Sequence, residues 1–134
     1  MTPAAVPQAL TPKRIRILVA DDDLRVRKMA RELLQPEFDV VDMVSDGEAL
    51  VAAALRLRPD VIVTDISMPA MSGIEAVRQI RSVMPEIKFV FFTMHDANGY
   101  RREAQSAGAV GYVLKSSARE ELNQTIRNAM ADSD

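Results

Sequence analysis

The sequence predicts an α/β protein with one open, doubly wound sheet of five parallel strands and helices on both faces. Two observations lead to this prediction. Short β-branched or aromatic runs alternate five times with segments in which apolar residues recur every three or four positions. The connections between them are short, as in βα units, where a helix carries the chain back to start the next parallel strand.

Five short apolar runs are the predicted strands. The third consists of Val61, Ile62, Val63 and Thr64, all of them β-branched, which is typical of a strand covered on both faces. The predicted strands cover residues 14–20, 38–45, 61–64, 88–93 and 109–114. The number of strand–helix units and the length of the chain favour the flavodoxin-like strand order 2-1-3-4-5.

Each strand is followed by a predicted helix with one apolar stripe. In the third helix Ile74, Val77 and Ile80 share a face, and Ser72 just before it is a favoured N-cap residue. The weakest stripe belongs to the fourth helix, which we expect to be short. The predicted helices cover residues 24–34, 47–57, 73–84, 99–108 and 118–130.

The composition is that of one globular domain. The chain has 134 residues, of which 48% are hydrophobic and 27% charged, enough for a single apolar core. We expect the folded domain to cover residues 14–131. Residues 1–13 are rich in Pro, Ala and Thr and are predicted to be a flexible N-terminal tail, and residues 132–134 form the C-terminal end.

Composition also excludes several kinds of site. The chain has no cysteine, which excludes disulfides and thiolate metal sites, and its single histidine, His95, excludes a multi-histidine metal site. A net charge of −2 argues against a nucleic-acid or anionic-membrane surface. No apolar run approaches the roughly 20 residues that span a bilayer, and no secretory signal is recognisable. We therefore expect a cytoplasmic protein.

Chemically active residues follow the predicted strands. They are Asp21, Asp22 and Asp23 after the first strand, Asp65 after the third, Thr93 at the end of the fourth and Lys115 after the fifth. Because the carboxyl ends of parallel strands meet at one edge of the sheet, we expect these side chains to lie in one crevice. Open α/β sheets bind their ligands at this edge.

Carboxylates gathered in one crevice repel each other unless a cation intervenes. Mg²⁺ prefers carboxylate and carbonyl oxygens, so Asp21, Asp22 and Asp65 are the predicted magnesium ligands, together with a backbone carbonyl. An Asp65 carboxylate beside the ion can attack phosphorus as a nucleophile and form an aspartyl phosphate. Lys115 would then pair with one phosphoryl oxygen, and the Thr93 hydroxyl would donate to another.

Four motifs occur in order along the chain: ILVADDD, TDISMPAMSG, FFTMHD and AGAVGYVLKS. With them, the chain from about Arg14 to Ala131 resembles the receiver (CheY-like) domain of two-component response regulators. The resemblance implies that Asp65 accepts a phosphoryl group from the phosphohistidine of a histidine kinase. It also implies that the Ser67 backbone carbonyl is a further Mg²⁺ ligand. Thr93 and Tyr112 match the switch pair of the family, in which the aromatic ring turns inward behind the threonine.

Two short segments are similar to the NarL or LuxR group of these regulators: TMHD after the fourth strand and LKSS after the fifth. Ser116 stands where other groups have proline, so a cis peptide bond is not expected there. The resemblance implies transcription regulation through a C-terminal helix-turn-helix domain or, for a single-domain regulator, a downstream partner, and the sequence leaves both open. It also implies a homodimer through the fourth helix, fifth strand and fifth helix, or through the first and fifth helices.

Two other functions compete with the phosphoacceptor switch, which is not an enzyme acting on a separate substrate. A magnesium-dependent phosphohydrolase of the haloacid-dehalogenase kind would need a second acid two residues after Asp65, where the chain has Ser67. A phosphate-independent pseudo-receiver usually lacks one of the acids or the lysine, and all are present here.

Among the remaining charges, Asp23 is expected to cap the first helix. A basic cluster in that helix is expected to form a solvated face: Arg25, Arg27, Lys28 and Arg31.

Overall fold

A computed structural model describes residues 14–94 and 98–131 and confirms the predicted fold class. The strands are β1 (Arg16–Ala20), β2 (Asp39–Val44), β3 (Val61–Thr64), β4 (Lys88–Thr93) and β5 (Gly111–Leu114). Neighbouring strands pair in parallel in the order β2-β1-β3-β4-β5. This is the predicted order 2-1-3-4-5, with β3 at the centre of the sheet.

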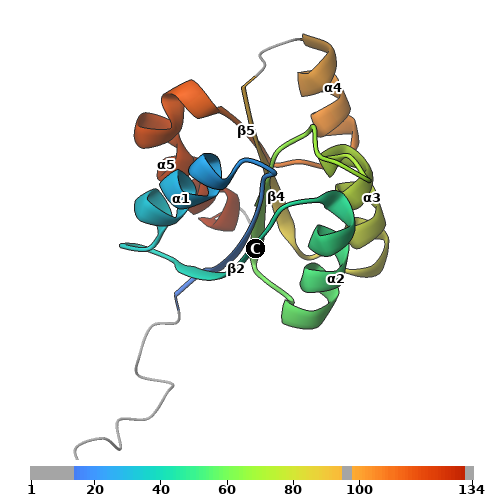
Figure 1. Cartoon of the computed structure of the whole chain (residues 1–134), viewed down its shortest axis with the longest axis horizontal. Helices are drawn as coiled ribbons and strands as arrows, with labels where there is room; N and C mark the ends of the chain where they lie inside the picture. The colour runs from blue at the N-terminus through green and yellow to red at the C-terminus, as the bar shows by residue number, and fades with distance from the viewer. Residues whose placement is uncertain (1–13, 95–97, 132–134) are drawn as a thin grey trace, which may run out of the picture.

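Helices cover both faces of the sheet, as Figure 1 shows. They are α1 (Leu24–Leu34), α2 (Gly47–Leu57), α3 (Gly73–Val83), α4 (Asn98–Ser106) and α5 (Ala118–Ala131), with a short 3₁₀ turn, η2 (Lys115–Ser117), before α5. Helices α1 and α5 lie on one face, and α2, α3 and α4 lie on the other. Every predicted strand and helix exists, and the ends agree to within two residues.

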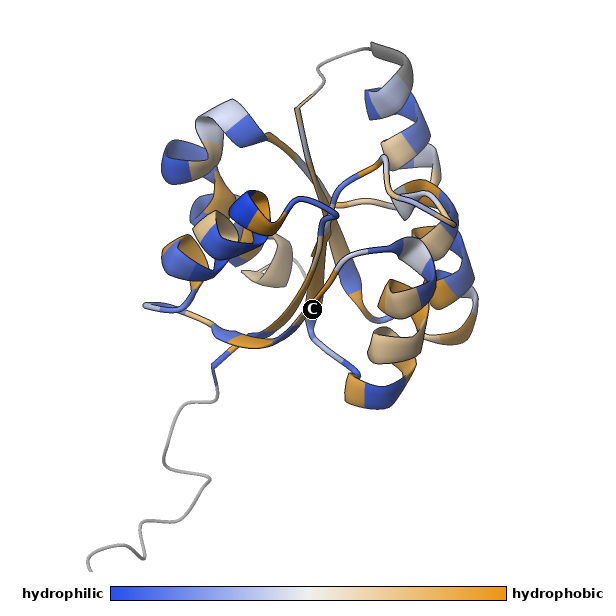
Figure 2. Cartoon of the chain, in the orientation of Figure 1, coloured by the Kyte–Doolittle hydropathy of each residue, from blue (hydrophilic) through white to orange (hydrophobic). Residues whose placement is uncertain are grey.

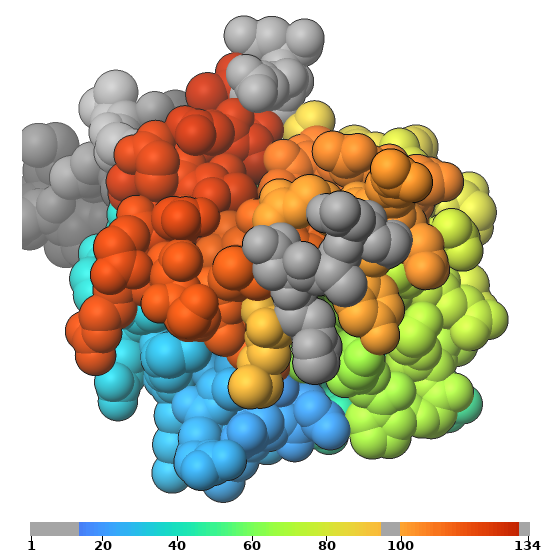
Figure 3. Space-filling view, turned by 90° about the horizontal axis from the view of Figure 1, so that it is seen from above, coloured from blue at the N-terminus to red at the C-terminus, as the bar shows by residue number. Residues whose placement is uncertain are grey.

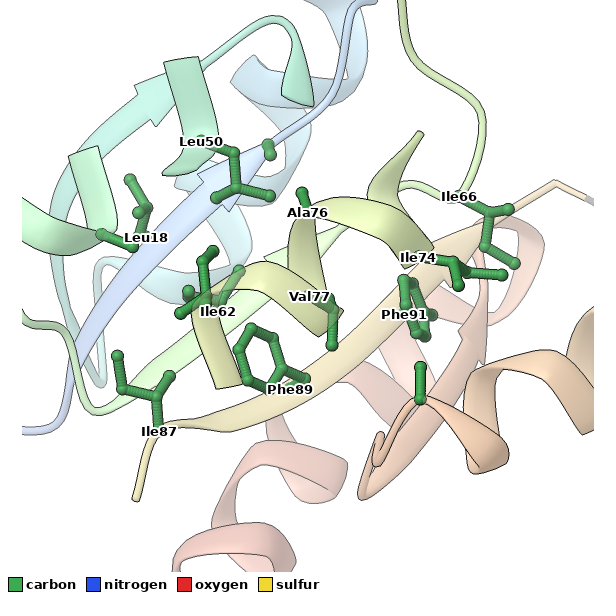
Figure 4. Packing of buried hydrophobic residues seen from close by; sticks show 14 of the residues in the cluster. Leu18, Leu50, Ile62, Ile66, Ile74, Ala76, Val77, Ile87, Phe89 and Phe91 are labelled. Atoms are coloured by element: carbon green, nitrogen blue, oxygen red, sulfur yellow. The ribbon is translucent and has the colours of Figure 1, made fainter. Parts of the chain in front are cut away.

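The sheet separates two apolar cores. Along β4, Phe89 and Phe91 pack toward α2, α3 and α4, whereas Val90 and Phe92 pack toward α1 and α5. Figure 4 shows the first of these clusters, with Phe91 beside Ile74 of α3 and Phe89 nearer to Val77 and Ile62. Because both faces are covered, β1, β3 and β4 are apolar and buried over most of their length, and these strands appear largely orange in Figure 2.

Helix termini agree with the predicted boundary residues. Asp23 caps α1, since its carboxylate accepts a hydrogen bond from the amide of Arg25, and Ser72 caps α3 through the amide of Glu75. Helix α4 is the shortest of the five and buries Ala104. Its weak apolar stripe in the sequence therefore corresponds to a narrow contact with the core.

Two further expectations concern residues that the structure describes, and others fall outside them. The peptide bonds within residues 14–94 and 98–131 are all trans, as Ser116 in place of proline leads us to expect. No helix among the described residues combines the length and apolar character needed to cross a bilayer. Residues 1–13, His95 and residues 132–134 lie outside the described residues.

Candidate functional site

Three strand ends place charged side chains at one edge of the sheet. Asp21 follows β1, Asp65 follows β3 and Lys115 follows β5. The amide of Asp65 donates to the carbonyl oxygen of Ala20 at 3.0 Å, and the amide of Asp21 donates to that of Val44 at 3.0 Å, so the ladders continue up to both aspartates. Figure 3 shows this edge from above, where the blue segment after β1, the green segment before α3 and the orange-red segment of α5 come together.

The ammonium of Lys115 bridges the two buried aspartates. Its Nζ lies 2.7 Å from Oδ2 of Asp21 and 2.9 Å from Oδ2 of Asp65. The exposed side-chain fractions are 1% for Asp21, 12% for Asp65 and 11% for Lys115. Because unpaired carboxylates are costly at such burial, the lysine ammonium compensates both acids electrostatically.

The pKa values of two of these groups are shifted by their surroundings. Burial raises the pKa of Asp21 above its ordinary value, and hydrogen bonds from Lys115 and the Asp23 amide offset this only in part. Burial acts to lower the pKa of Lys115, but its hydrogen bonds to Asp21 and Asp65 outweigh burial and hold that pKa above its ordinary value. Lys115 is therefore charged at neutral pH, and the Asp21 carboxylate would gain from a further cation.

Asp22 completes an acidic cluster at the same edge. It is exposed, and one carboxylate oxygen from each of Asp21, Asp22 and Asp65 lies within 4.8 Å of the other two. Oδ2 of Asp21 is buried and, in the described part of the chain, forms the ion pair with Lys115 but no further hydrogen bond. Hard oxygen donors around an incompletely satisfied buried carboxylate fit a divalent cation, so the cluster is suited to a metal ion such as Mg²⁺.

The loop between β3 and α3 orients the Asp65 carboxylate through its backbone. The amides of Ile66 and Ser67 donate to Oδ1 of Asp65 at 2.7 and 3.4 Å. Oδ1 is thus held by the loop, while Oδ2 faces Lys115. Ser67, whose carbonyl oxygen is the predicted additional metal ligand, lies in this loop two residues after Asp65.

Two backbone features keep this loop close to the site. A Cβ atom on Gly73 would lie 1.9 Å from the carbonyl oxygen of Asp65, so glycine is needed where α3 starts. Ala70 has a φ of 68°, and the amide of Met71 donates across it to the carbonyl oxygen of Pro69 at 2.7 Å. A positive φ is unfavourable for alanine, so the loop beside Asp65 contains backbone strain.

Thr93 and Tyr112, the predicted switch pair, project to the same side of the sheet. Thr93 is buried at the end of β4, two residues after Phe91, and residues two apart in a strand share a face. Tyr112 lies opposite Phe91 in the β4–β5 ladder and packs against the same core cluster. The two side chains therefore belong to adjacent strands and to the face that α2, α3 and α4 cover.

One arginine does not behave as the sequence leads us to expect. Lys28 and Arg31 are exposed, in agreement with a solvated basic face on α1. For Arg27 the prediction is wrong: the residue is half-buried, and its guanidinium donates to the carbonyl oxygen of Asp21 at 2.7 Å. The available sequence signal is its place in the first turn of α1, from which a long side chain points back toward the preceding strand end.

A family model for the response regulator receiver domain matches residues 17–127. The chain belongs to this family. The match runs from β1 into α5 and includes every strand end described above. The protein is thus a receiver domain of a two-component response regulator, as its four motifs predict.

The receiver domain is similar to regulators of the NarL/LuxR group. It is 42% identical over 118 residues to the uncharacterized transcriptional regulatory protein YxjL of Bacillus subtilis, a match that covers 87% of this chain and 54% of the relative. The NarL signal receiver domain of Mycobacterium tuberculosis superposes with a TM-score of 0.85 at 27% identity, covering 90% of this chain and 99% of that one.

A second solved structure is closer in sequence. The LuxR-family two-component response regulator of Aurantimonas sp. SI85-9A1 has a TM-score of 0.83 and 36% identity, and the match covers 89% of this chain and 86% of that one. The receiver domain spans about half the length of the transcriptional regulators that it matches. These relatives confirm the fold and the subgroup predicted from the segments TMHD and LKSS.

Proposed function

We propose that this receiver domain accepts a phosphoryl group on Asp65 from the phosphohistidine of a histidine kinase and changes conformation as a result. The observation that carries the proposal is the setting of Asp65. Its carboxylate stands at the carboxyl end of the central strand, with one oxygen held by backbone amides and the other paired with Lys115. In the transfer, a carboxylate oxygen attacks phosphorus, the phosphorus–nitrogen bond to the histidine breaks and an aspartyl phosphate forms.

Two further side chains contact the phosphoryl group that Asp65 accepts. The Lys115 ammonium, already 2.9 Å from Asp65, pairs with a phosphoryl oxygen and neutralises charge that develops during transfer. The hydroxyl of Thr93 donates a hydrogen bond to another phosphoryl oxygen. Its place at the end of β4, next to β3, supports this role.

The acidic cluster holds Mg²⁺ in this proposal. The ligands are Asp21, Asp22 and Asp65 with the backbone carbonyl of Ser67. Three carboxylates and the Lys115 ammonium carry a formal charge of −2, which a divalent ion balances. When bound, Mg²⁺ supplies positive charge that polarises the phosphoryl oxygens.

The conformational response uses Thr93 and Tyr112. Once Asp65 is phosphorylated, the Thr93 hydroxyl follows the phosphoryl group and the Tyr112 ring turns inward behind it. The common sheet face of the two residues supports this coupling. The phosphoryl group thereby biases a two-state equilibrium that is displayed on α4, β5 and α5.

The output is a C-terminal DNA-binding domain or a separate downstream protein. Support comes from the transcriptional regulators among the relatives, which are about twice as long as this chain. In this proposal the receiver domain covers residues 14–131, works in the cytoplasm as a switch rather than as an enzyme on a separate substrate, and itself binds neither nucleic acid nor membrane. A homodimer through α4, β5 and α5, or through α1 and α5, belongs to the same proposal.

Intact-protein mass spectrometry tests the chemistry directly. The chain is incubated with acetyl phosphate, with and without Mg²⁺, as wild type, as Asp65→Asn and as the control Asp39→Asn, which changes an exposed acid at the start of β2. We expect a Mg²⁺-dependent gain of one phosphoryl group in the wild type and the control but not in Asp65→Asn. No gain, together with no binding of beryllofluoride, would favour the phosphate-independent pseudo-receiver.

A further inference from the structure

The guanidinium of Arg101 covers the ring of Tyr112. Arg101 belongs to α4 and Tyr112 to β5, and Cζ of the arginine lies 4.3 Å from the centroid of the ring. A cation is attracted to the face of an aromatic ring within about 6 Å of its centroid. Both residues are half-buried, so the contact lies at the surface between α4 and β5.

The surroundings leave the ring of Tyr112 room to move. A surface groove of about 200 Å³ runs along this side of α4 and β5. Besides Arg101 and Tyr112, it is lined by three small residues, Ala104, Ala109 and Gly111, and by Gln105 and Val110. Since the alanines and the glycine provide little bulk, the guanidinium that covers the ring contributes to holding it in this position.

The contact also connects α4 to the strand that leads into the candidate site. Tyr112 lies three residues before Lys115 in the chain, and Lys115 pairs with Asp65. Tyr112 shares its sheet face with Thr93, so an inward turn of the ring moves it toward Thr93 and away from the half-buried guanidinium of Arg101 at the surface. A ring in that position cannot keep its face against Arg101.

We propose that Arg101 is a positioning residue that latches Tyr112 in its half-buried position and thereby sets how readily the receiver domain switches. The inference rests on the proposed function of Asp65 and extends it to a residue outside the phosphoryl site. Because the stacked contact exists in one arrangement of Tyr112 and is lost in the other, it favours the unphosphorylated arrangement. A half-exposed cation–π contact shifts a two-state equilibrium by about two- to fivefold.

Fluorine NMR can follow the latch directly, since the chain has two tyrosines. Incorporation of 3-fluorotyrosine gives one resonance for Tyr100 and one for Tyr112, and Tyr100→Phe is made solely to assign them. The resonances are recorded without ligand and during a titration with beryllofluoride at saturating Mg²⁺. The end point of the titration in the wild type defines the position of the Tyr112 resonance in the switched state.

Three variants separate the stacked contact from general effects on α4. Arg101→Met keeps an unbranched apolar stem and removes the cation. Arg101→Lys returns a cation without the flat guanidinium and should restore part of the contact. Arg102→Met is the matched control, because Arg102 is the exposed neighbour on the same helix. Urea unfolding of each variant shows whether the fold is retained.

For Arg101→Met we expect the ligand-free Tyr112 resonance to move toward the switched position and the half-saturating beryllofluoride concentration to fall about two- to fivefold. Arg102→Met should match the wild type, and Arg101→Lys should fall between the two. If the wild type responds to beryllofluoride but Arg101→Met titrates like Arg102→Met, the latch is refuted while the proposed function stands. If the wild-type resonance does not respond and no phosphoryl gain is seen by mass, both the proposed function and the latch are refuted. If it does not respond although Asp65 gains a phosphoryl group, the Tyr112 switch and the latch are refuted while the phosphoacceptor role stands.

Discussion

Nζ of Lys115 lies 2.9 Å from Oδ2 of Asp65, although the two residues are 50 positions apart in the chain. The contact exists because β5 and β3 end at the same edge of the sheet. It places a cation against the carboxylate that we propose as phosphoacceptor. The same ammonium also pairs with Asp21, so one lysine compensates two buried acids.

Replacing Lys115 by methionine should destabilise the domain by about 3 kcal/mol in metal-free buffer at neutral pH, because both aspartates lose their buried partner. Mg²⁺ should recover part of the loss by supplying positive charge to the same carboxylates. The midpoint and slope of urea unfolding measure the effect. Lys28→Met, at an exposed position of α1, is the control, and equal midpoints for the two variants would contradict the prediction.

Asp22 allows metal binding to be tested apart from phosphorylation. At Mg²⁺ about 100 times above its dissociation constant, the wild type should gain about 2.7 kcal/mol of unfolding free energy. Asp22→Asn should lose most of this gain yet be no less stable than the wild type in metal-free buffer, because Asp22 is exposed and its charge there only repels the other two carboxylates. Urea titrations with Mg²⁺ and with a chelator measure both states. An undiminished gain in Asp22→Asn, equal to that of the control Asp39→Asn, would argue against Asp22 as a ligand.

The strained loop beside Asp65 leads to a third prediction. Ala70 has a φ of 68°, which glycine adopts without penalty. Ala70→Gly should therefore relieve backbone strain, and this gain is partly offset because glycine increases the conformational entropy of the unfolded chain. The expected net effect is a stabilisation of the domain by about 0.5–1 kcal/mol. The same substitution at Ala52, an exposed position inside α2, should destabilise it by about 1 kcal/mol. Thermal unfolding compares the two, and a loss of stability in both variants would show that Ala70 is not strained.

Glu37 carries a pH-dependent contribution to stability far from the site. A hydrogen bond from Arg127 of α5 holds the pKa of Glu37 below its ordinary value of 4.5, opposed by partial burial and supported by Asn123. A lowered folded-state pKa gives stability that is present above pH 4.5 and is lost as the pH falls through the folded value.

Glu37→Gln should therefore cost about 0.5–1 kcal/mol at pH 7, and its difference from the wild type should vanish as the pH is lowered below 4.5. Urea midpoints over this range provide the measurement. Glu32→Gln, at an exposed position of α1, serves as the reference. A deficit that stays constant with pH would mean that the ion pair is not its source.

Local patterns were sufficient for the secondary structure and for predicting which strand ends meet at the candidate site. Apolar periodicity depends on backbone geometry, so Ile74, Val77 and Ile80 identified the buried face of α3 before any packing was known. Parallel strands share one carboxyl edge, so Asp65 and Lys115 could be assigned to a common crevice from their places after two strands.

Contacts between side chains could not be read in this way. The chain order does not show that Asp21 is buried while Asp22 is exposed, that Arg27 turns back to a strand end, or that Arg101 stacks on Tyr112. Each depends on the register of the strands, the rotation of a helix about its axis and a choice of rotamer. Register, helix rotation and rotamer are determined by packing among residues far apart in sequence. The sequence pattern shows only which face of an element is apolar and which residue follows a strand.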